Sequence, residues 1–225
     1  MKNYKQSPKK IGLLGGSFDP VHLGHLDLAQ QILKSFHLDK VIFIPNFKSP
    51  YFAQRKKLLS SKHRFKMLEL ALKFRDNLSV DNFEIQKGNI SYTLSTLKHF
   101  YKKNTSLYFI TGIDTFKTMA SWYRYQELFT LTHFVVVPRA SQTLPKPSHI
   151  LPKKFFTKNF KKVPHKEIWK HLSNHKIFYK KIKTLPISSS TVREKIKKGM
   201  NVKNLISKEV YKYIEKTSLY KKKTS

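Results

Sequence analysis

The fold is decided by one continuous stretch, which reads Gly15-Gly16-Ser17-Phe18-Asp19-Pro20-Val21-His22-Leu23-Gly24-His25. An apolar run, Ile11 to Leu14, leads into the two glycines, and an amphipathic segment begins at the histidines. A strand, a tight turn and a helix start are therefore predicted at one point. Two histidines three residues apart share a face on the first helical turn. Because glycine lets phosphate approach the backbone and a helix start attracts it, this stretch indicates a nucleotide triphosphate site.

Outward from this stretch, apolar runs rich in β-branched residues alternate with helical patterns. Strands are predicted over residues 10–14, 41–45, 78–85, 107–111, 133–137 and 176–182, and helices over 22–36, 60–74, 91–101, 114–128, about 191–198 and 207–216. This alternation predicts an α/β fold with a doubly wound parallel sheet covered on both faces. Ligands bind beyond the carboxyl ends of such strands, where the strand order reverses. We therefore expect the turns after Leu14 and Thr111 to face one crevice.

Length and composition favour one globular unit. A chain of 225 residues can bury one substantial core. We expect a single domain over residues 1–225, with a core over about 9–139, a Lys/Pro-rich insertion over about 140–184, and a serine run with helices over about 185–220. The insertion is expected to be loop-rich and partly helical, and to end in a last strand.

The sequence also indicates a cellular compartment. No run of 18 apolar residues and no long apolar segment near the N-terminus is present, so neither a membrane span nor a signal peptide is expected. The absence of cysteine excludes disulfides, thiolate metal sites and a cysteine nucleophile. We therefore expect a cytoplasmic protein.

The net charge of +32 raises the possibility of a nucleic-acid partner. Of the 45 basic residues only six are arginine, although arginine is the better residue for reading bases and gripping phosphate. Lysine, phenylalanine and tyrosine are all abundant and share AT-rich codons, so base bias explains the composition. We expect no specific nucleic-acid partner. A basic nucleic-acid-binding module on a nucleotide-binding fold stays open as an alternative.

Two further segments carry candidate site residues. The first is the hydroxyl run Ser188-Ser189-Ser190-Thr191 followed by Arg193, which is suited to an anion at a helix start, although serine is also the ordinary capping residue. The second is Gly112-Ile113-Asp114 with Trp122, where a carboxylate can accept from ribose hydroxyls and an exposed indole can stack on a heteroaromatic ring. The competing roles are a helix-capping aspartate and a core tryptophan.

Four segments together resemble the bacterial nicotinate-nucleotide adenylyltransferases, within the nucleotidyltransferase superfamily marked by a His-x-Gly-His motif. The matching segments are residues 15–25, 90–97, 109–114 with Trp122, and 187–193, and residues 205–220 also resemble the end of that family. The resemblance implies a Rossmann-like domain with a short C-terminal helical extension. It also implies transfer of AMP from ATP to nicotinate mononucleotide, in line and without a general base, in NAD biosynthesis.

The resemblance further implies a role for each matching residue. His22 and His25 would contact α- and β-phosphate oxygens, with backbone N–H groups from Gly16, Ser17 and Phe18. The remaining ATP contacts would come from Ser188, Ser189, Ser190 and Arg193 at the β- and γ-phosphates and from Gly112 and Asp114 at the adenosine. The mononucleotide would meet Asn46, Thr93, Trp122 and Tyr123. Mg²⁺ would be carried by the ATP phosphates rather than by a protein metal site, and Asp19 would serve the turn.

One departure and two enzymatic alternatives accompany this resemblance. The family has a basic pair after the second strand, where this chain has Tyr51-Phe52; Lys48 or Arg55 could supply the charge. Nicotinamide mononucleotide adenylyltransferase is the first alternative, because the choice of acid or amide depends on one carboxylate contact. Nucleotidyltransferases for pantetheine phosphate or glycerol phosphate share only the first motif. Homo-oligomerisation is a further possibility.

Overall fold

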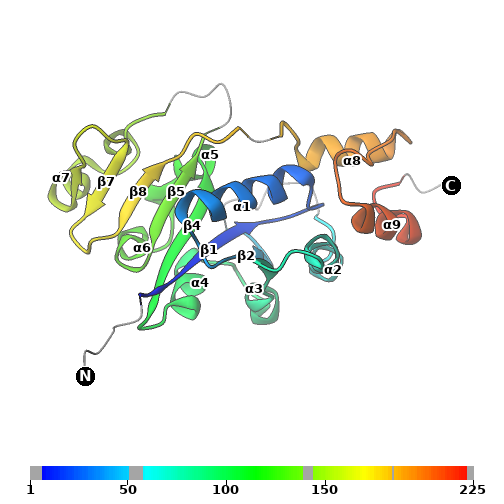
Figure 1. Ribbon diagram of the computed structural model, residues 1–225, viewed down its shortest axis with the longest axis horizontal. Helices are drawn as coiled ribbons and strands as arrows, with labels where there is room; N and C mark the ends of the chain where they lie inside the picture. Colours follow the sequence, from blue (N-terminus) through cyan, green and yellow to red (C-terminus); the bar gives the residue numbers. More distant parts are fainter. Residues whose placement is uncertain (1–6, 51–57, 139–143, 184, 222–225) are drawn as a thin grey trace.

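The strands of the computed structural model form one eight-stranded sheet, which carries the helices on both faces (Figure 1). The structure describes residues 7–50, 58–138, 144–183 and 185–221. The strands are β1 Lys9–Gly16, β2 Lys40–Pro45, β3 Leu78–Val80, β4 Thr105–Gly112, β5 His133–Val137, β6 Phe160–Lys162, β7 Ile168–His171 and β8 Lys176–Tyr179. The helices are α1 Leu23–Phe36, α2 Ser61–Leu72, α3 Phe83–Lys87, α4 Thr93–Phe100, α5 Ile113–Phe116, η1 Met119–Ser121, α6 Tyr125–Leu131, η2 Pro147–His149, α7 Lys153–Asn159, α8 Ser189–Lys197 and α9 Lys208–Thr217.

The strand order is β3-β2-β1-β4-β5-β8-β7-β6, and the first six strands of that order are parallel. The chain moves outward from β1 to β3 and then returns to place β4 on the other side of β1, so the order reverses between β1 and β4. This confirms the predicted α/β, Rossmann-like, doubly wound sheet. Leu14 of β1 is in register with Ile110 of β4. The turns after β1 and β4 therefore lie next to each other at one edge of the sheet.

Alternate residues of the central strands enter two different cores. Leu14 belongs to a cluster that includes α1, α2, α8 and α9, whereas Leu13 belongs to a cluster that includes α4, α5 and α6. Side chains alternate across a strand, so a continuous apolar run is what a sheet buried on both faces requires. The core predicted from these runs is therefore confirmed on both faces of β1.

The strand predicted over residues 78–85 is wrong beyond Val80. After β3, the Asp81 carboxylate accepts a hydrogen bond from the backbone N–H of Phe83, with Oδ1 and N 2.8 Å apart. An aspartate that bonds the backbone two residues ahead turns the chain, and α3 begins at Phe83. The local side-chain contact overrides the alternating pattern.

The insertion over residues 140–184 contains more strand than predicted. It holds α7 and the expected last strand, which as β8 lies parallel to β5, but β6 and β7 also add antiparallel strands at the sheet edge. These two strands are only three and four residues long, and their lysines Lys161, Lys162 and Lys170 are exposed. Such short strands lack enough alternation to be detected, and their position depends on Phe160 and Trp169 packing into the core.

The C-terminal helices α8 and α9 lie beyond the carboxyl end of β1, at the opposite end of the molecule from β7 (Figure 1). Gly199 follows α8 with a φ of 68°, the left-handed conformation that commonly ends a helix. The backbone N–H of Leu23 donates to the carbonyl of Leu205, which joins the start of α1 to this segment. Within the described residues, none of the helices combines the length and apolar character that crossing a bilayer requires.

Candidate active site

The turn after β1 places two histidine rings in contact at the start of α1. His22 occupies the cap position of the helix and His25 its first turn. The ring centroids lie 3.6 Å apart, with 27° between the planes. The predicted sharing of one helix face is therefore confirmed, and the two rings form a single pair.

The histidine pair is uncharged at neutral pH. Burial lowers the pKa of His22 to about 4, and burial together with the nearby His22 lowers the pKa of His25 well below its usual value. The backbone N–H of His22 donates to Nδ1 of His25, at 3.3 Å. A ring that accepts at Nδ1 carries its proton on Nε2, so His25 is a neutral donor through Nε2.

The Nδ1 atom of His22 is buried and has no hydrogen-bond partner among the described residues. The side chain is only 6% exposed. Nearly all buried polar atoms in proteins are paired, and an unpaired one is costly. In the reciprocal cap of α1 the His22 side chain faces the backbone N–H of His25, and a helix start of this kind favours a bound anion such as a phosphate group.

Two glycines are required here by close packing. A Cβ at Gly16 would lie 3.0 Å from the Phe18 ring, which is buried under the turn and contacts the His25 ring edge-on at 5.1 Å. A Cβ at Gly24 would lie 3.1 Å from Nδ1 of His22 and 3.2 Å from the Leu185 carbonyl oxygen. Both glycines therefore let side chains pack around the histidine pair.

Arg64 of α2 is a site residue that sequence reasoning missed. Its side chain is 1% exposed, and Nη1 donates to the carbonyl of Ser17 at 2.8 Å. Nη2 donates to the carbonyl of Asn46 at 2.7 Å, and Nε donates to the carbonyl of Leu59 at 3.1 Å. The guanidinium thus holds the loops after β1 and β2 together. Nothing local identifies it, because in the sequence it is one basic residue of an amphipathic helix.

The serine run lies against the turn after β1. Ser188 caps α8, since its Oγ accepts from the backbone N–H of Thr191 at 3.1 Å. Ser189 Oγ donates to the Pro20 carbonyl at 2.9 Å, and Arg193 donates to the Asp19 carbonyl at 2.6 Å. A second Arg193 nitrogen donates to Ser190 Oγ. The structure therefore brings this predicted ATP-binding segment to the turn after β1, residues 17–22, which we call the histidine turn. There it holds backbone carbonyls of the turn in place.

The end of β4 is open above the sheet. A Cβ built on Gly112 would meet no atom within 4 Å, and Asp114, in the first turn of α5, is exposed. Both residues of the predicted adenosine contact are therefore accessible next to the end of β1.

Trp122 is buried, which agrees with the core alternative rather than with an exposed indole. Its side chain is 5% exposed and belongs to the core, where the ring meets Phe109 edge-on at 6.1 Å. The indole N–H donates to Thr118 Oγ1 at 3.0 Å. The core role thus describes this ring in the structure. The next residue, Tyr123, is 52% exposed and contacts the ring of Tyr92 at 4.8 Å.

Of the remaining predicted mononucleotide residues, one follows β2 and one begins α4. Asn46 follows β2 and donates its backbone N–H to the carbonyl of Gly16, at 3.0 Å. Thr93 begins α4 and is partly buried. Lys48 is exposed. Tyr51, Phe52 and Arg55 lie outside the described residues.

The carboxylate of Asp19 is occupied inside the protein. The side chain is 2% exposed, and Oδ1 accepts a hydrogen bond from the Tyr220 hydroxyl at 2.6 Å. Oδ2 accepts from the backbone N–H of Leu59 at 3.5 Å. The turn role predicted for Asp19 therefore fits its contacts.

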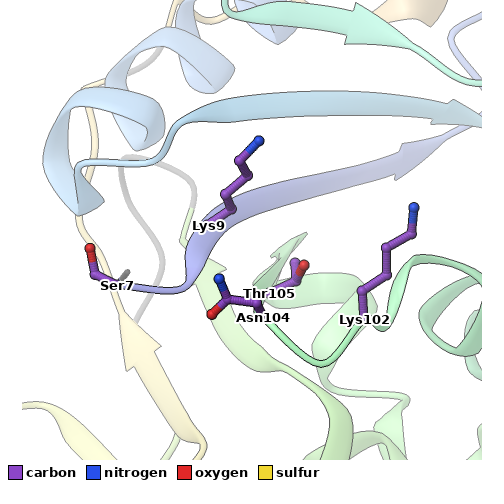
Figure 2. Close-up of a pocket in the computed structure, with 5 residues that line it drawn as sticks. All are labelled: Ser7, Lys9, Lys102, Asn104 and Thr105. Carbon is purple, nitrogen blue, oxygen red and sulfur yellow. The ribbon is translucent and has the colours of Figure 1, made fainter. Parts of the chain in front are cut away.

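A hollow of about 470 Å³ lies at the other end of the sheet. Figure 2 shows the residues that line it, which are Ser7, Lys9, Lys102, Asn104 and Thr105. They stand at the amino ends of β1 and β4, away from the histidine pair. This hollow is separate from the candidate active site.

Comparison with known proteins decides the family. The cytidylyltransferase-like family model matches residues 13–195. A "probable nicotinate-nucleotide adenylyltransferase" of Clostridium botulinum is 33% identical over 216 residues, covering 95% of this chain and 98% of that protein. One of Desulfitobacterium hafniense is 34% identical over 221 residues, covering 97% and 99%. This chain belongs to the nicotinate-nucleotide adenylyltransferases.

The fold of this adenylyltransferase family is also found among solved structures. A Plasmodium falciparum nicotinic acid mononucleotide adenylyltransferase complexed with NaAD matches with a TM-score of 0.68 at 21% identity, over 94% of this chain and 97% of that one. At this identity the match concerns the fold. It supports the doubly wound sheet.

Proposed function

We propose that this protein transfers the AMP group of ATP to nicotinate mononucleotide, which yields nicotinate adenine dinucleotide and pyrophosphate for NAD biosynthesis. Its family relatives carry the name of this activity over nearly the full length of the chain. Among the structural features, the stacked His22–His25 pair at the start of α1 carries the proposal. Such a pair at a helix start is suited to a triphosphate.

The reaction needs positioning more than proton transfer. A 5′-phosphate oxygen of the mononucleotide attacks the α-phosphorus of ATP, and the bond to the bridging oxygen of the β-phosphate breaks. The electron pair leaves with pyrophosphate. Because the attacking phosphate is already an anion at neutral pH, no general base is required. Donors held in place around the developing charge account for the catalysis.

The histidine pair supplies such donors. His25 would donate through Nε2, and His22 would donate through a ring N–H. Backbone N–H groups of Gly16, Ser17 and Phe18 would add to them at the α- and β-phosphates. Neutral rings with lowered pKa values keep these roles across the neutral pH range.

Neighbouring segments would hold the rest of the two substrates. We assign the β- and γ-phosphates to Ser188, Ser189, Ser190 and Arg193, and the adenosine to Gly112 and Asp114. The mononucleotide would lie near Asn46, Thr93, Trp122 and Tyr123. The hydrogen bonds of Ser189 and Arg193 to the turn support a triphosphate path between α1 and α8.

Mg²⁺ would enter with the triphosphate. The buried carboxylate of the histidine turn, Asp19, is already bonded to Tyr220 and to the chain, so the site favours a cation carried by phosphate oxygens. When bound, it would neutralise phosphate charge. The histidines and Arg193 would act on the phosphate oxygens that the cation leaves open.

Pyrophosphate release tests the proposal directly. Purified protein is incubated with ATP and Mg²⁺, with nicotinate and nicotinamide mononucleotide in parallel. A strong preference for the acid is expected. Preference for the amide would assign the protein to the nicotinamide enzyme, and release with neither would contradict adenylyl transfer.

The cellular setting follows from this function. We propose a cytoplasmic enzyme whose partners are its two substrates, without a specific nucleic-acid ligand. A binding curve separates the two interpretations: a charge-driven nucleic-acid binder would lose polynucleotide affinity steeply with added salt and ignore ATP, whereas the enzyme should bind ATP. Self-association is measured in the same preparation by sedimentation.

A further inference from the structure

The C-terminal segment reaches back to the turn that carries the histidine pair. The hydroxyl of Tyr220 donates to Oδ1 of Asp19 at 2.6 Å, across 201 positions of sequence. Asp19 is 2% exposed and lies three residues before His22. This contact therefore joins the end of the described chain to the side chain inside the turn.

The surroundings of Tyr220 determine which group donates this hydrogen bond. Burial, followed by the charge of Asp19 and the hydrogen bond to it, raises the pKa of Tyr220 far above its usual value. The tyrosine therefore keeps its proton and donates. A charge-assisted hydrogen bond to a buried carboxylate is stronger than one between neutral groups. Its loss would leave one carboxylate oxygen without this donor.

Backbone contacts restrain the same turn from other sides. Arg64 holds the carbonyl of Ser17, Arg193 holds that of Asp19, and Ser189 holds that of Pro20. All of these contacts act on carbonyl oxygens of the main chain. Tyr220 acts on a side chain of the turn, and it comes from a different segment.

The C-terminal segment is anchored independently of Tyr220. Leu219 is 9% exposed and packs into the core, and the Tyr213 hydroxyl lies 2.8 Å from Nδ1 of His63. Tyr220 itself has a φ of 65°, a left-handed conformation that is uncommon for a bulky residue. Such conformations persist where surrounding contacts impose them and cluster at functional sites. The segment is thus held in place with the Tyr220 ring turned toward Asp19.

We propose that Tyr220 is a positioning residue for adenylyl transfer: through Asp19 it holds the histidine turn in the geometry that the reaction needs. The inference depends on the proposed function. A displacement of about 1 Å in a reacting geometry costs on the order of a hundredfold in rate. The loss of Tyr220's hydroxyl should therefore affect turnover more than substrate binding.

The test compares two variants with the same chemical change. Tyr220→Phe removes the hydroxyl bonded to Asp19, and Tyr213→Phe removes the hydroxyl bonded to His63 in the same segment. We expect Tyr220→Phe to lower kcat about tenfold or more, with KM for the mononucleotide within about twofold of the wild type. Tyr213→Phe should keep kcat. Melting temperatures verify that both variants are folded at the assay temperature.

A double variant tests whether Tyr220 acts through Asp19. If it does, adding Tyr220→Phe to Asp19→Ala should reduce kcat no further, because the contact is already gone. Equal kcat in the two tyrosine variants, or losses that multiply in the double variant, would overturn the inference. If the wild type releases no pyrophosphate, the proposed function itself fails. Wild-type activity with an unaffected Tyr220→Phe overturns only the positioning role.

Discussion

The rings of His22 and His25 are stacked with their centroids 3.6 Å apart, a geometry suited to two neutral imidazoles. Two charged rings at this distance would repel each other in a buried site. The lowered pKa values of both residues agree with the neutral pair. At neutral pH the pair therefore acts on phosphate through directed N–H groups rather than through net charge.

Replacing His25 with alanine should remove one of these donors. We expect His25→Ala to lower turnover by at least ~100-fold, the scale reported for loss of a preorganised charge-stabilising donor. The measurement is steady-state pyrophosphate release, with circular dichroism to confirm folding. His149→Ala, which changes an exposed histidine in η2, serves as the control and should retain activity. A folded His25→Ala protein with near-normal turnover would rule out the catalytic assignment.

Replacing Arg64 with lysine should loosen the loops after β1 and β2. A single ammonium cannot reproduce the guanidinium contacts to the carbonyls of Ser17, Asn46 and Leu59. We expect Arg64→Lys to lower the free energy of unfolding by about 2–4 kcal/mol, because buried carbonyls lose their donors. Urea denaturation measures this change. Arg75→Lys, at an exposed arginine, should be neutral, and equal stability of the two variants would disprove the bracing role.

Two neighbouring aromatic residues, Trp122 and Tyr123, allow an effect on core packing to be distinguished from an effect on substrate binding. Trp122→Ala should lower the free energy of unfolding by about 3–5 kcal/mol, as expected for a buried ring. Tyr123→Ala removes an exposed ring and should leave stability within about 0.5 kcal/mol. If Tyr123 contacts the mononucleotide, its variant should raise KM for that substrate and not for ATP. A stable Trp122→Ala protein with weakened mononucleotide binding would instead restore the stacking role of the indole.

Acid should destabilise the protein through His133 as well as the active-site pair. Burial, with His175, Lys176 and Lys10 nearby, lowers the pKa of His133 to about 4, and its Nδ1 accepts from the backbone N–H of Lys176 at 3.0 Å. The unfolded chain binds this proton at higher pH than the folded one, so stability falls as the pH drops from about 6.5 toward 4.

The variant His133→Gln keeps an acceptor but does not titrate. Relative to this variant, the wild type should lose about 2 kcal/mol of unfolding free energy between pH 7.5 and pH 5. Urea denaturation at the two pH values provides the comparison. Parallel losses in both proteins would show that His133 does not contribute to the acid sensitivity.

Much of the fold was predictable because its signals are local. The apolar runs of β1, β2, β4 and β5 are continuous, and the helix starts carry capping residues such as Ser60 and Ser207. The prediction was wrong where a single contact overrode the pattern, as at Asp81, or where strands were too short to show one, as in β6 and β7. The sequence left the burial of Trp122 undecided, since it depends on a contact with Phe109 of β4 in the same core.

The sequence by itself determined the strand, the glycine turn and the histidine spacing over residues 11–25, because a helix sets the relation between neighbours four or fewer residues apart. Only the tertiary structure decided what surrounds that turn. Arg64 meets Ser17 across 47 positions, and Tyr220 meets Asp19 across 201. Contacts of this kind arise when the sheet and the C-terminal helices pack together. No periodicity or spacing along the chain indicates which distant side chain will contact the turn.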